Sequence, residues 1–317
     1  MNFRFLNIIL LFFVFTISNC QNLENKDYFE KIGQLKLNYS IRGKGPVMII
    51  GHLYSGKIGY QLTLKSLENR FTMVYYEPRG TGKSESPKTL QEYDPNYIVD
   101  EIDNLRKHLN VDKIWLFGHS DQSAIALDYA LKFPNHIEGL ILSGTSLVGT
   151  QQESIERRKI SEQDRSNESI WFSQVIQNWD FMIKNKTEKN NLGEDISNSP
   201  IKWWCYDENS SQKVIPIVNE ISKQGRRKSI DGKYWIESEE NRNQYLKSQN
   251  EFHNIKAKIL IINGKYDTNN PPKYAELLHE KLPNSKLVLI EKAGHFPWIE
   301  NPEPTFQEIE NWLNLNL

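Results

Sequence analysis

A short motif in the middle of the sequence can support nucleophilic chemistry. Gly118-His119-Ser120-Asp121 directly follows an apolar run and precedes a segment of helical period. A serine hydroxyl is a poor nucleophile at neutral pH and needs a neighbouring base. On a sharp turn from strand to helix, its oxygen is exposed and backbone N–H groups face the developing oxyanion. Ser120 is therefore a candidate nucleophile, and His119 beside it is expected to pack in the turn rather than to act as the base.

Gln122 departs from the pattern of such a turn, in which a glycine is expected at this position. A buried and unpaired amide would cost about 1–3 kcal/mol of stability. We therefore predict that the turn is intact and that the amide of Gln122 has a hydrogen-bond partner.

The residues that would activate Ser120 follow it in the chain. Asp267 comes after the apolar run 257–263, and His295 comes after a further helical and a further apolar segment. A histidine can take the serine proton, while an aspartate fixes its tautomer and stabilises the imidazolium. Taken singly, Asp267 also suits a turn or helix cap, and His295 a loop. The order Ser, Asp, His at three predicted strand ends favours a catalytic triad.

The rest of the chain supplies elements that can position these residues. Short apolar runs alternate with segments of helical period, which indicates an α/β fold with a mostly parallel sheet covered by helices on both faces. The expected strands are 35–43, 46–50, 71–76, 113–117, 137–143, 257–263 and 286–290. The expected helices include 97–109, 123–133, 273–281 and 305–315.

This alternation breaks between residues 149 and 252. The stretch is rich in Asn, Ser, Lys and Glu, yet it holds five of the eight tryptophans of the chain. So many large aromatic side chains are not typical of a linker. We interpret 149–252 as a helical lid inserted into an α/β core formed by 35–148 and 253–317.

Composition excludes several classes of protein. The 317 residues include 39 Lys and Arg against 40 Asp and Glu, so the net charge of −1 argues against a nucleic-acid partner. Two cysteines cannot form a disulfide framework, and the seven histidines are scattered without a metal-binding spacing. Gly82-Lys83-Ser84 lacks the earlier glycine of a phosphate-binding loop, since residue 77 is glutamate. We expect no metal and no cofactor.

The N-terminus has the pattern of an export signal. Arg4 precedes a mostly apolar run, and the segment 1–19 ends before Cys20. This resembles a bacterial lipoprotein signal, which implies acylation of Cys20, a short N-terminal tether over 20–34 and a membrane-anchored location in a bacterial envelope. An ordinary signal peptide and an uncleaved anchor are the alternatives.

Several motifs together resemble the α/β-hydrolase superfamily. They are Gly118–Ser120, Asp267, Gly294-His295-Phe296-Pro297 and Glu300-Asn301-Pro302. Glu77–Ser84 resembles the Asp-x-Arg-Gly-x-Gly-x-Ser turn of its proline iminopeptidase-like members, with glutamate in place of the first aspartate. The resemblance covers about residues 36–312 and matches the insertion to the family's variable lid.

The resemblance implies a serine hydrolase that cleaves an ester or amide bond through an acyl-serine intermediate. The subfamily suggests an aminopeptidase that releases N-terminal proline from short peptides. Such an enzyme must neutralise a free ammonium, and the lid offers four candidate glutamates: Glu153, Glu156, Glu162 and Glu168. A general carboxylesterase and a catalytically inactive, membrane-tethered binding protein are the alternatives.

The resemblance also implies two backbone donors for the oxyanion. One is the N–H of Asp121, directly after the nucleophile. The family's second donor lies in a His-Gly-x-Pro segment, which reads Gly51-His52-Leu53-Tyr54-Ser55-Gly56 in this chain. Depending on how the segments are aligned, this donor is the N–H of Leu53 or of Tyr54.

Overall fold

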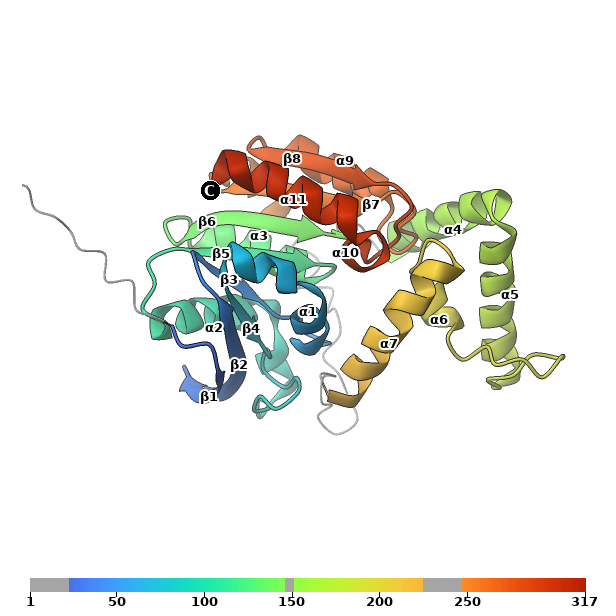
Figure 1. The fold of residues 1–317 in the computed structure, drawn as a ribbon, viewed down its shortest axis with the longest axis horizontal. Coiled ribbons are helices and arrows are strands. Elements are labelled where there is room, and N and C mark those ends of the chain that lie inside the picture. The colour runs from blue at the N-terminus through green and yellow to red at the C-terminus, as the bar shows by residue number, and fades with distance from the viewer. Residues whose placement is uncertain (1–22, 146–150, 225–246) are drawn as a thin grey trace, which may run out of the picture.

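The chain is built on an eight-stranded sheet with the order β1-β2-β4-β3-β5-β6-β7-β8 (Figure 1). The computed structural model describes residues 23–145, 151–224 and 247–317. Strand β2 pairs antiparallel with β1 and β4, and the other neighbouring strands pair in parallel. The strands are β1 (Asp27–Ile32), β2 (Leu35–Gly43), β3 (Val47–Ile50), β4 (Thr72–Tyr76), β5 (Ile114–His119), β6 (Ile137–Ser143), β7 (Lys258–Gly264) and β8 (Ser285–Ile290).

The α/β fold and all seven expected strands are confirmed, with ends that differ by no more than a few residues. The central strands are readable in the sequence because helices cover both faces of the sheet, so every residue of β3, β4 and β5 is buried. Parallel neighbours bring their carboxyl ends to one edge of the sheet, where ligands bind in open α/β folds.

The tether expected over 20–34 is wrong for its second half, because residues Asp27–Ile32 form the edge strand β1. This strand pairs antiparallel with β2, and the Tyr28 ring stacks on Tyr39 with 4.8 Å between centroids. Most side chains of β1 face at least partly into solvent. An edge strand of this kind needs no continuous apolar run, so the polar sequence concealed it.

Two hydrophobic clusters fill the two sides of the sheet. The first contains side chains of α2, α3 and α9, and the second contains side chains of α1 and α11 (Figure 1). The helices of the core are α1 (Ile58–Thr63), α2 (Pro95–His108), α3 (Gln122–Lys132), α9 (Pro272–Lys281), α10 (Pro297–Glu300) and α11 (Pro302–Asn316), with 3-10 turns η1 (Lys65–Asn69), η2 (Leu90–Tyr93) and η3 (Gln249–Asn254). The four helices expected from the sequence correspond to α2, α3, α9 and α11.

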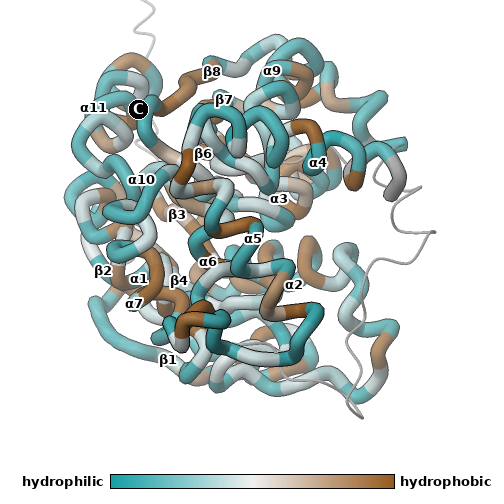
Figure 2. Tube along the Cα trace, turned by 90° about the vertical axis from the view of Figure 1, so that its right-hand side faces the viewer, coloured by the Kyte–Doolittle hydropathy of each residue, from teal (hydrophilic) through white to brown (hydrophobic). Residues whose placement is uncertain are grey.

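Four described helices lie between β6 and β7, within the stretch expected to be inserted. They are α4 (Gln151–Glu168), α5 (Ile170–Asn185), α6 (Ser199–Lys202) and α7 (Glu208–Gln224), and α4 and α5 project from one end of the core, toward the viewer of Figure 2. Phe172, Val175 and Trp203 form a small buried cluster of their own, with Trp171, Trp179 and Trp204 packed against it. The aromatic residues therefore serve as the interior of the insertion, which ends slightly earlier than expected because Phe252 already belongs to the core.

Some of the sequence-based predictions fall outside the described residues. These are the signal segment 1–19 and the acylation site Cys20, together with the parts of the insertion at 149–150 and 225–246. Among the helices that the structure describes, none combines the length and the apolar composition needed to cross a membrane.

Candidate active site

Ser120 lies on a strained turn between β5 and α3. Its φ of 53° falls in the left-handed region that residues other than glycine rarely adopt. The Ser120 N–H donates to the Ser143 carbonyl at 3.0 Å, and a Cβ on Gly118 would come within 2.8 Å of the Ser123 Cα. The turn therefore requires glycine at position 118. Ser120 itself is half-buried. Strain of this kind clusters at functional sites.

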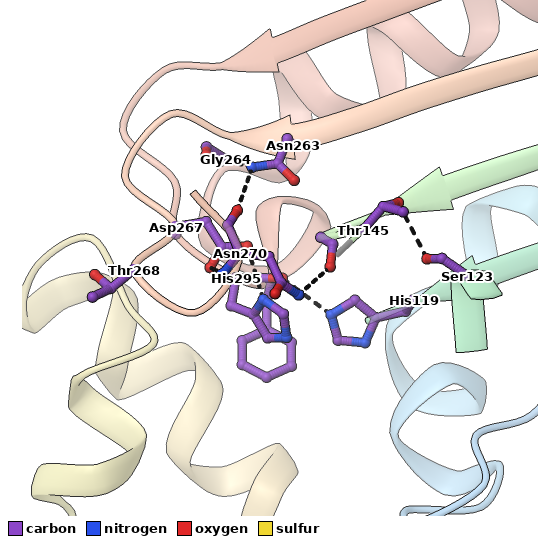
Figure 3. Close-up of polar contacts among 12 residues, drawn as sticks. His119, Ser123, Thr145, Asn263, Gly264, Asp267, Thr268, Asn270 and His295 are labelled. Carbon is purple, nitrogen blue, oxygen red and sulfur yellow. Dashed lines mark hydrogen bonds and ion pairs between the residues drawn. The ribbon is translucent and has the colours of Figure 1, made fainter. Parts of the chain in front are cut away.

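Asp267 and His295 form a buried pair beyond the ends of β7 and β8. The His295 Nδ1 and Asp267 Oδ2 atoms are 2.8 Å apart, and each side chain is at least 95% buried (Figure 3). The other carboxylate oxygen, Oδ1, accepts the Asn270 N–H at 2.9 Å. Because Nδ1 faces the carboxylate, it carries the imidazole proton, and Nε2 is left to accept another one.

The serine and the pair meet at the carboxyl edge of the sheet. Gly144 shows their proximity: a Cβ on it would lie 3.1 Å from the His295 ring and 3.4 Å from His119. Gly144 directly follows Ser143, whose carbonyl accepts the Ser120 N–H. In the described chain no hydrogen bond joins the Ser120 hydroxyl to His295. Catalytic hydrogen bonds are often long in unliganded proteins and shorten when substrate binds.

His119 connects the strand of the nucleophile to the loop of His295. Its Nδ1 lies 3.0 Å from the Tyr60 hydroxyl, and its Nε2 lies 3.1 Å from the His295 carbonyl. A carbonyl only accepts, so Nε2 is the donor and the Tyr60 hydroxyl donates to Nδ1. Burial and the adjacent His295 hold the pKa of His119 well below its usual range. His119 is thus a neutral residue that holds the two strand ends together, in line with the packing role expected from the sequence.

The loop after β3 distinguishes between the two candidate oxyanion donors. Two backbone hydrogen bonds between His52 and Gly56, at 3.0 and 2.8 Å, close this loop. The Tyr54 N–H donates to His52 Nδ1 at 3.2 Å, whereas the Leu53 N–H has no partner among the described residues. Burial lowers the pKa of His52 to about 3, so its Nδ1 remains an acceptor. The geometry favours Leu53 over Tyr54, together with Asp121, which is the N-cap of α3.

Gln122 is buried, but its amide oxygen Oε1 has no hydrogen-bond partner in the described chain. The prediction of a paired amide is therefore wrong for this oxygen. Its neighbour is the hydroxyl of Tyr76, which is buried and unpaired as well. Burial raises the pKa of the Tyr76 hydroxyl well above its usual range, and the adjacent Gln122 amide partly offsets this effect. Tyr76, at the end of the apolar strand β4, thus places its hydroxyl close to the Gln122 amide, but the hydroxyl and the amide oxygen lack the geometry of a hydrogen bond.

The glycine-rich turn after β4 is closed by the side chain of its first residue, Glu77. The Glu77 carboxylate accepts the Lys83 N–H at 2.6 Å, and a Cβ on Gly82 would lie 2.2 Å from that carboxylate. The glutamate therefore occupies the space inside the turn, which agrees with the rejection of a phosphate-binding loop. Within the described ranges, no three His, Cys, Asp or Glu side chains are arranged to hold a metal ion.

Glu300 joins the insertion to the loop that carries His295. Its buried carboxylate accepts three backbone N–H groups at 2.8–3.0 Å, from Tyr206, Gly294 and Phe296. The Trp204 carbonyl also accepts the His295 N–H at 2.8 Å. Burial raises the pKa of Glu300, while these N–H groups favour its charged form. In the sequence, Glu300 stands out only as part of the motif Glu300-Asn301-Pro302, as a carboxylate five residues after His295 in a mostly apolar segment.

Comparison with known proteins identifies the family. A family model described as "alpha/beta hydrolase fold" matches residues 46–302, and the chain belongs to this family. A proline iminopeptidase of Clostridioides difficile is 25% identical over 296 residues, which are 92% of this chain and 95% of that protein. The structural likeness extends to a proline iminopeptidase-related protein from Thermus thermophilus, with a TM-score of 0.66, 16% identity and coverage of 93% of this chain and 99% of that chain.

A thermophilic esterase from Thermogutta terrifontis has the same fold, with a TM-score of 0.61 and 20% identity over 91% of this chain and 98% of that chain. The motif-based resemblance to the α/β hydrolases is thereby confirmed. The expectation of a hydrolytic enzyme is confirmed as well.

The triad variants test the roles of the three candidate residues. Ser120→Ala and His295→Ala are each expected to lower kcat on a nitrophenyl ester by about 10⁴–10⁶, because triad members act as a unit. Asp267→Asn, which leaves a neutral partner for His295, is expected to cost less. Steady-state rates of the purified proteins give the comparison. A Ser120→Ala variant with more than about a tenth of the wild-type rate would contradict a serine nucleophile.

The unpaired oxygen of Gln122 has a measurable cost. Gln122→Met removes it at similar volume and is expected to raise the free energy of unfolding by about 1 kcal/mol. Gln122→Gly removes the whole side chain and is expected to lower this free energy by about 1–3 kcal/mol. Urea denaturation measures the free energy of unfolding of both variants. In each variant kcat should change less than about tenfold, and the change should be similar in the two. Loss of stability in Gln122→Met would show that the amide oxygen is paired in solution.

Proposed function

We propose that this protein is a serine hydrolase that releases N-terminal proline from short peptides. The observation that carries the proposal is Ser120 on its strained turn, beside the buried Asp267–His295 pair. Ser120 Oγ attacks the scissile carbonyl and its proton passes to His295 Nε2, while Asp267 stabilises the imidazolium. His295 then protonates the leaving amine. Water, deprotonated by the same imidazole, hydrolyses the acyl-serine and regenerates the enzyme.

The negative charge on the tetrahedral intermediate needs donors that are already in place. We assign this role to the N–H groups of Leu53 and Asp121, the first because it has no partner among the described residues. One such donor is typically worth about 10²–10³ in rate. The intact turn His52–Gly56 holds the Leu53 peptide without the glycine and proline found in the family motif.

Specificity for an N-terminal residue requires a group that binds a free ammonium. Glu162 of α4 is the best of the four candidate glutamates, because Glu153, Glu156 and Glu168 are exposed and Glu162 is partly buried. The Glu162 Oε1 accepts the Trp203 indole N–H at 2.9 Å. Burial raises the pKa of Glu162, and the nearby Asp180 raises it further. The partly buried Glu162 and the exposed Asp180 interact electrostatically, and two neighbouring carboxylates attract a cation.

The surroundings of Glu162 also suit an ammonium. Trp203 packs edge to face with Trp179, with 5.4 Å between ring centroids, and indole faces attract cations. The next residue, Trp204, has its ring centroid 6.3 Å from that of His295. The aromatic interior of the insertion therefore runs from Glu162 toward the candidate triad. This continuity, together with the relatives named proline iminopeptidase, favours a peptidase over a general esterase.

A substrate panel with a matched pair of variants tests the assignment. The wild type is expected to hydrolyse proline nitroanilide with a higher kcat/KM than nitrophenyl acetate. Glu162→Gln is expected to raise KM for proline nitroanilide by about tenfold or more, since it removes a charge opposite the ammonium. KM for the ester, which carries no ammonium, should stay unchanged. Glu168→Gln, on the exposed side of the same helix, serves as the control.

The other outcomes of this panel assign the other functions. Activity restricted to esters, with equal effects of Glu162→Gln and Glu168→Gln, would identify a carboxylesterase. Absence of any hydrolysis by a folded wild-type protein would favour a binding protein that has kept the fold.

We also propose that Cys20 is acylated and anchors the enzyme in a bacterial envelope. Arg4, the apolar run after it and the cysteine support this assignment. Strand β1 begins at Asp27, so residues 21–26 would reach at most about 20 Å when fully extended. Such a short tether would keep the enzyme close to the membrane surface. A single acyl chain binds membranes only marginally, so stable anchoring requires the several chains of a lipoprotein cysteine.

Expression in a bacterial host tests the anchor. Radiolabelled fatty acid is expected in the wild type and in Cys205→Ser, whose cysteine is buried in the fold, and to be absent from Cys20→Ser. Cys20→Ser should also appear in the soluble fraction. A mature N-terminus at an unmodified residue other than Cys20 would exclude lipidation.

A further inference from the structure

Arg165 of α4 has a buried guanidinium group, only 6% exposed, that makes no ion pair within the described chain. Its Nη1 donates to Thr268 Oγ1 at 2.7 Å, and its Nη2 donates to the carbonyls of Cys205 and Tyr206 at 2.9 and 2.8 Å. The Cζ atom lies 3.8 Å from the ring centroid of Phe172. Because a buried charge is costly to hold, these three hydrogen bonds and the ring contact indicate a specific role.

One partner of Arg165 belongs to the loop of the catalytic acid. Thr268 directly follows Asp267 and is fully buried. The same turn returns to Asp267 through Asn270, whose N–H donates to Asp267 Oδ1 (Figure 3). A hydrogen bond to Thr268 therefore restrains the backbone that carries the Asp267 carboxylate.

The other partners belong to the segment 204–206, which holds the loop of the catalytic base. The Trp204 carbonyl accepts the His295 N–H at 2.8 Å, and the Tyr206 N–H donates to Glu300. A Cβ on Gly294 would lie 2.2 Å from the Trp204 carbonyl oxygen, so this contact allows no side chain between the two segments. Arg165 is thus connected to both halves of the Asp267–His295 pair.

The charge of Arg165 acts on the same two loops. Burial lowers the pKa of the guanidinium to about 10, and the negative charges of Glu300 and Asp267 oppose this effect. Arg165 is therefore a cation at neutral pH. Its charge lies within electrostatic reach of the Asp267 carboxylate without direct contact.

We propose that Arg165 is a positioning residue for the reaction assigned above: its hydrogen bonds fix the Asp267 turn against the segment 204–206, which accepts the His295 N–H. The proposal rests on the proposed function for its kinetic readout. The titratable groups that face Arg165 are Asp267, Glu300, Cys205 and Tyr206. Those that face His295 are Asp267, His119 and His52.

Two substitutions separate the geometry from the charge. Arg165→Met removes both, and we expect kcat on a nitrophenyl ester to fall about tenfold or more while KM changes less than about threefold. Arg165→Lys keeps the charge but not the planar fork, so kcat should fall in this variant as well, again with little change in KM.

The NMR resonance of the His295 Nδ1–H, which is hydrogen-bonded to Asp267, reports the same geometry without turnover. This resonance is expected to move in Arg165→Met and Arg165→Lys and to stay unchanged in Arg158→Met, which replaces an exposed arginine on the same helix. Thermal unfolding verifies that each variant is folded. If Arg165→Met does not fold, the kcat of Arg165→Lys alone tests the positioning role.

Wild-type values of kcat and of the His295 Nδ1–H resonance in Arg165→Met, or a wild-type kcat in Arg165→Lys, would overturn the positioning role. A lower unfolding temperature with a wild-type His295 Nδ1–H resonance would show that Arg165 only stabilises the fold, which would also overturn it. A wild-type protein without hydrolytic activity would instead refute the proposed function. In that case the NMR resonance still decides whether Arg165 positions His295.

Discussion

The candidate active site depends on one buried hydrogen bond, between His295 Nδ1 and Asp267 Oδ2 at 2.8 Å. The two residues lie on separate loops, and burial of their side chains means that a misplaced partner cannot be replaced by water. Fixing two loops also costs conformational entropy, which only tertiary contacts can offset. Parallel strands β7 and β8 bring the loops to one edge of the sheet, and the rest of the site has to hold them there.

The helical insertion takes part in this restraint and is more than a cover. Its segment 204–206 accepts the His295 N–H and donates to the Glu300 carboxylate, which also binds the peptide groups on both sides of His295. Arg165 reaches from α4 to the same segment and to the Asp267 turn. A change in the insertion is therefore expected to alter the position of the Asp267–His295 pair.

The sequence predicted the parts of the molecule that depend on local patterns. The central strands are continuous apolar runs, and Ser120, Asp267 and His295 each follow one of these runs. The features that depend on distant contacts could not be predicted from the sequence. Strand β1 has the polar sequence of an edge strand, and Arg165 is hydrogen-bonded to Thr268, which lies 103 positions away in the chain. The choice between the two oxyanion donors also needed coordinates, because it depends on the orientation of one ring, that of His52. Likewise, nothing in the sequence near Gln122 indicates what faces its amide oxygen.

The central claim is that Ser120 is a nucleophile activated by the Asp267–His295 pair. The most direct test is to treat the wild-type protein with a fluorophosphonate and to locate the adduct by mass spectrometry of its peptides. We expect one adduct, on Ser120 in the wild type, and no adduct in His295→Ala. A folded wild-type protein that remains unlabelled, or that carries its adduct on another residue, would contradict this claim.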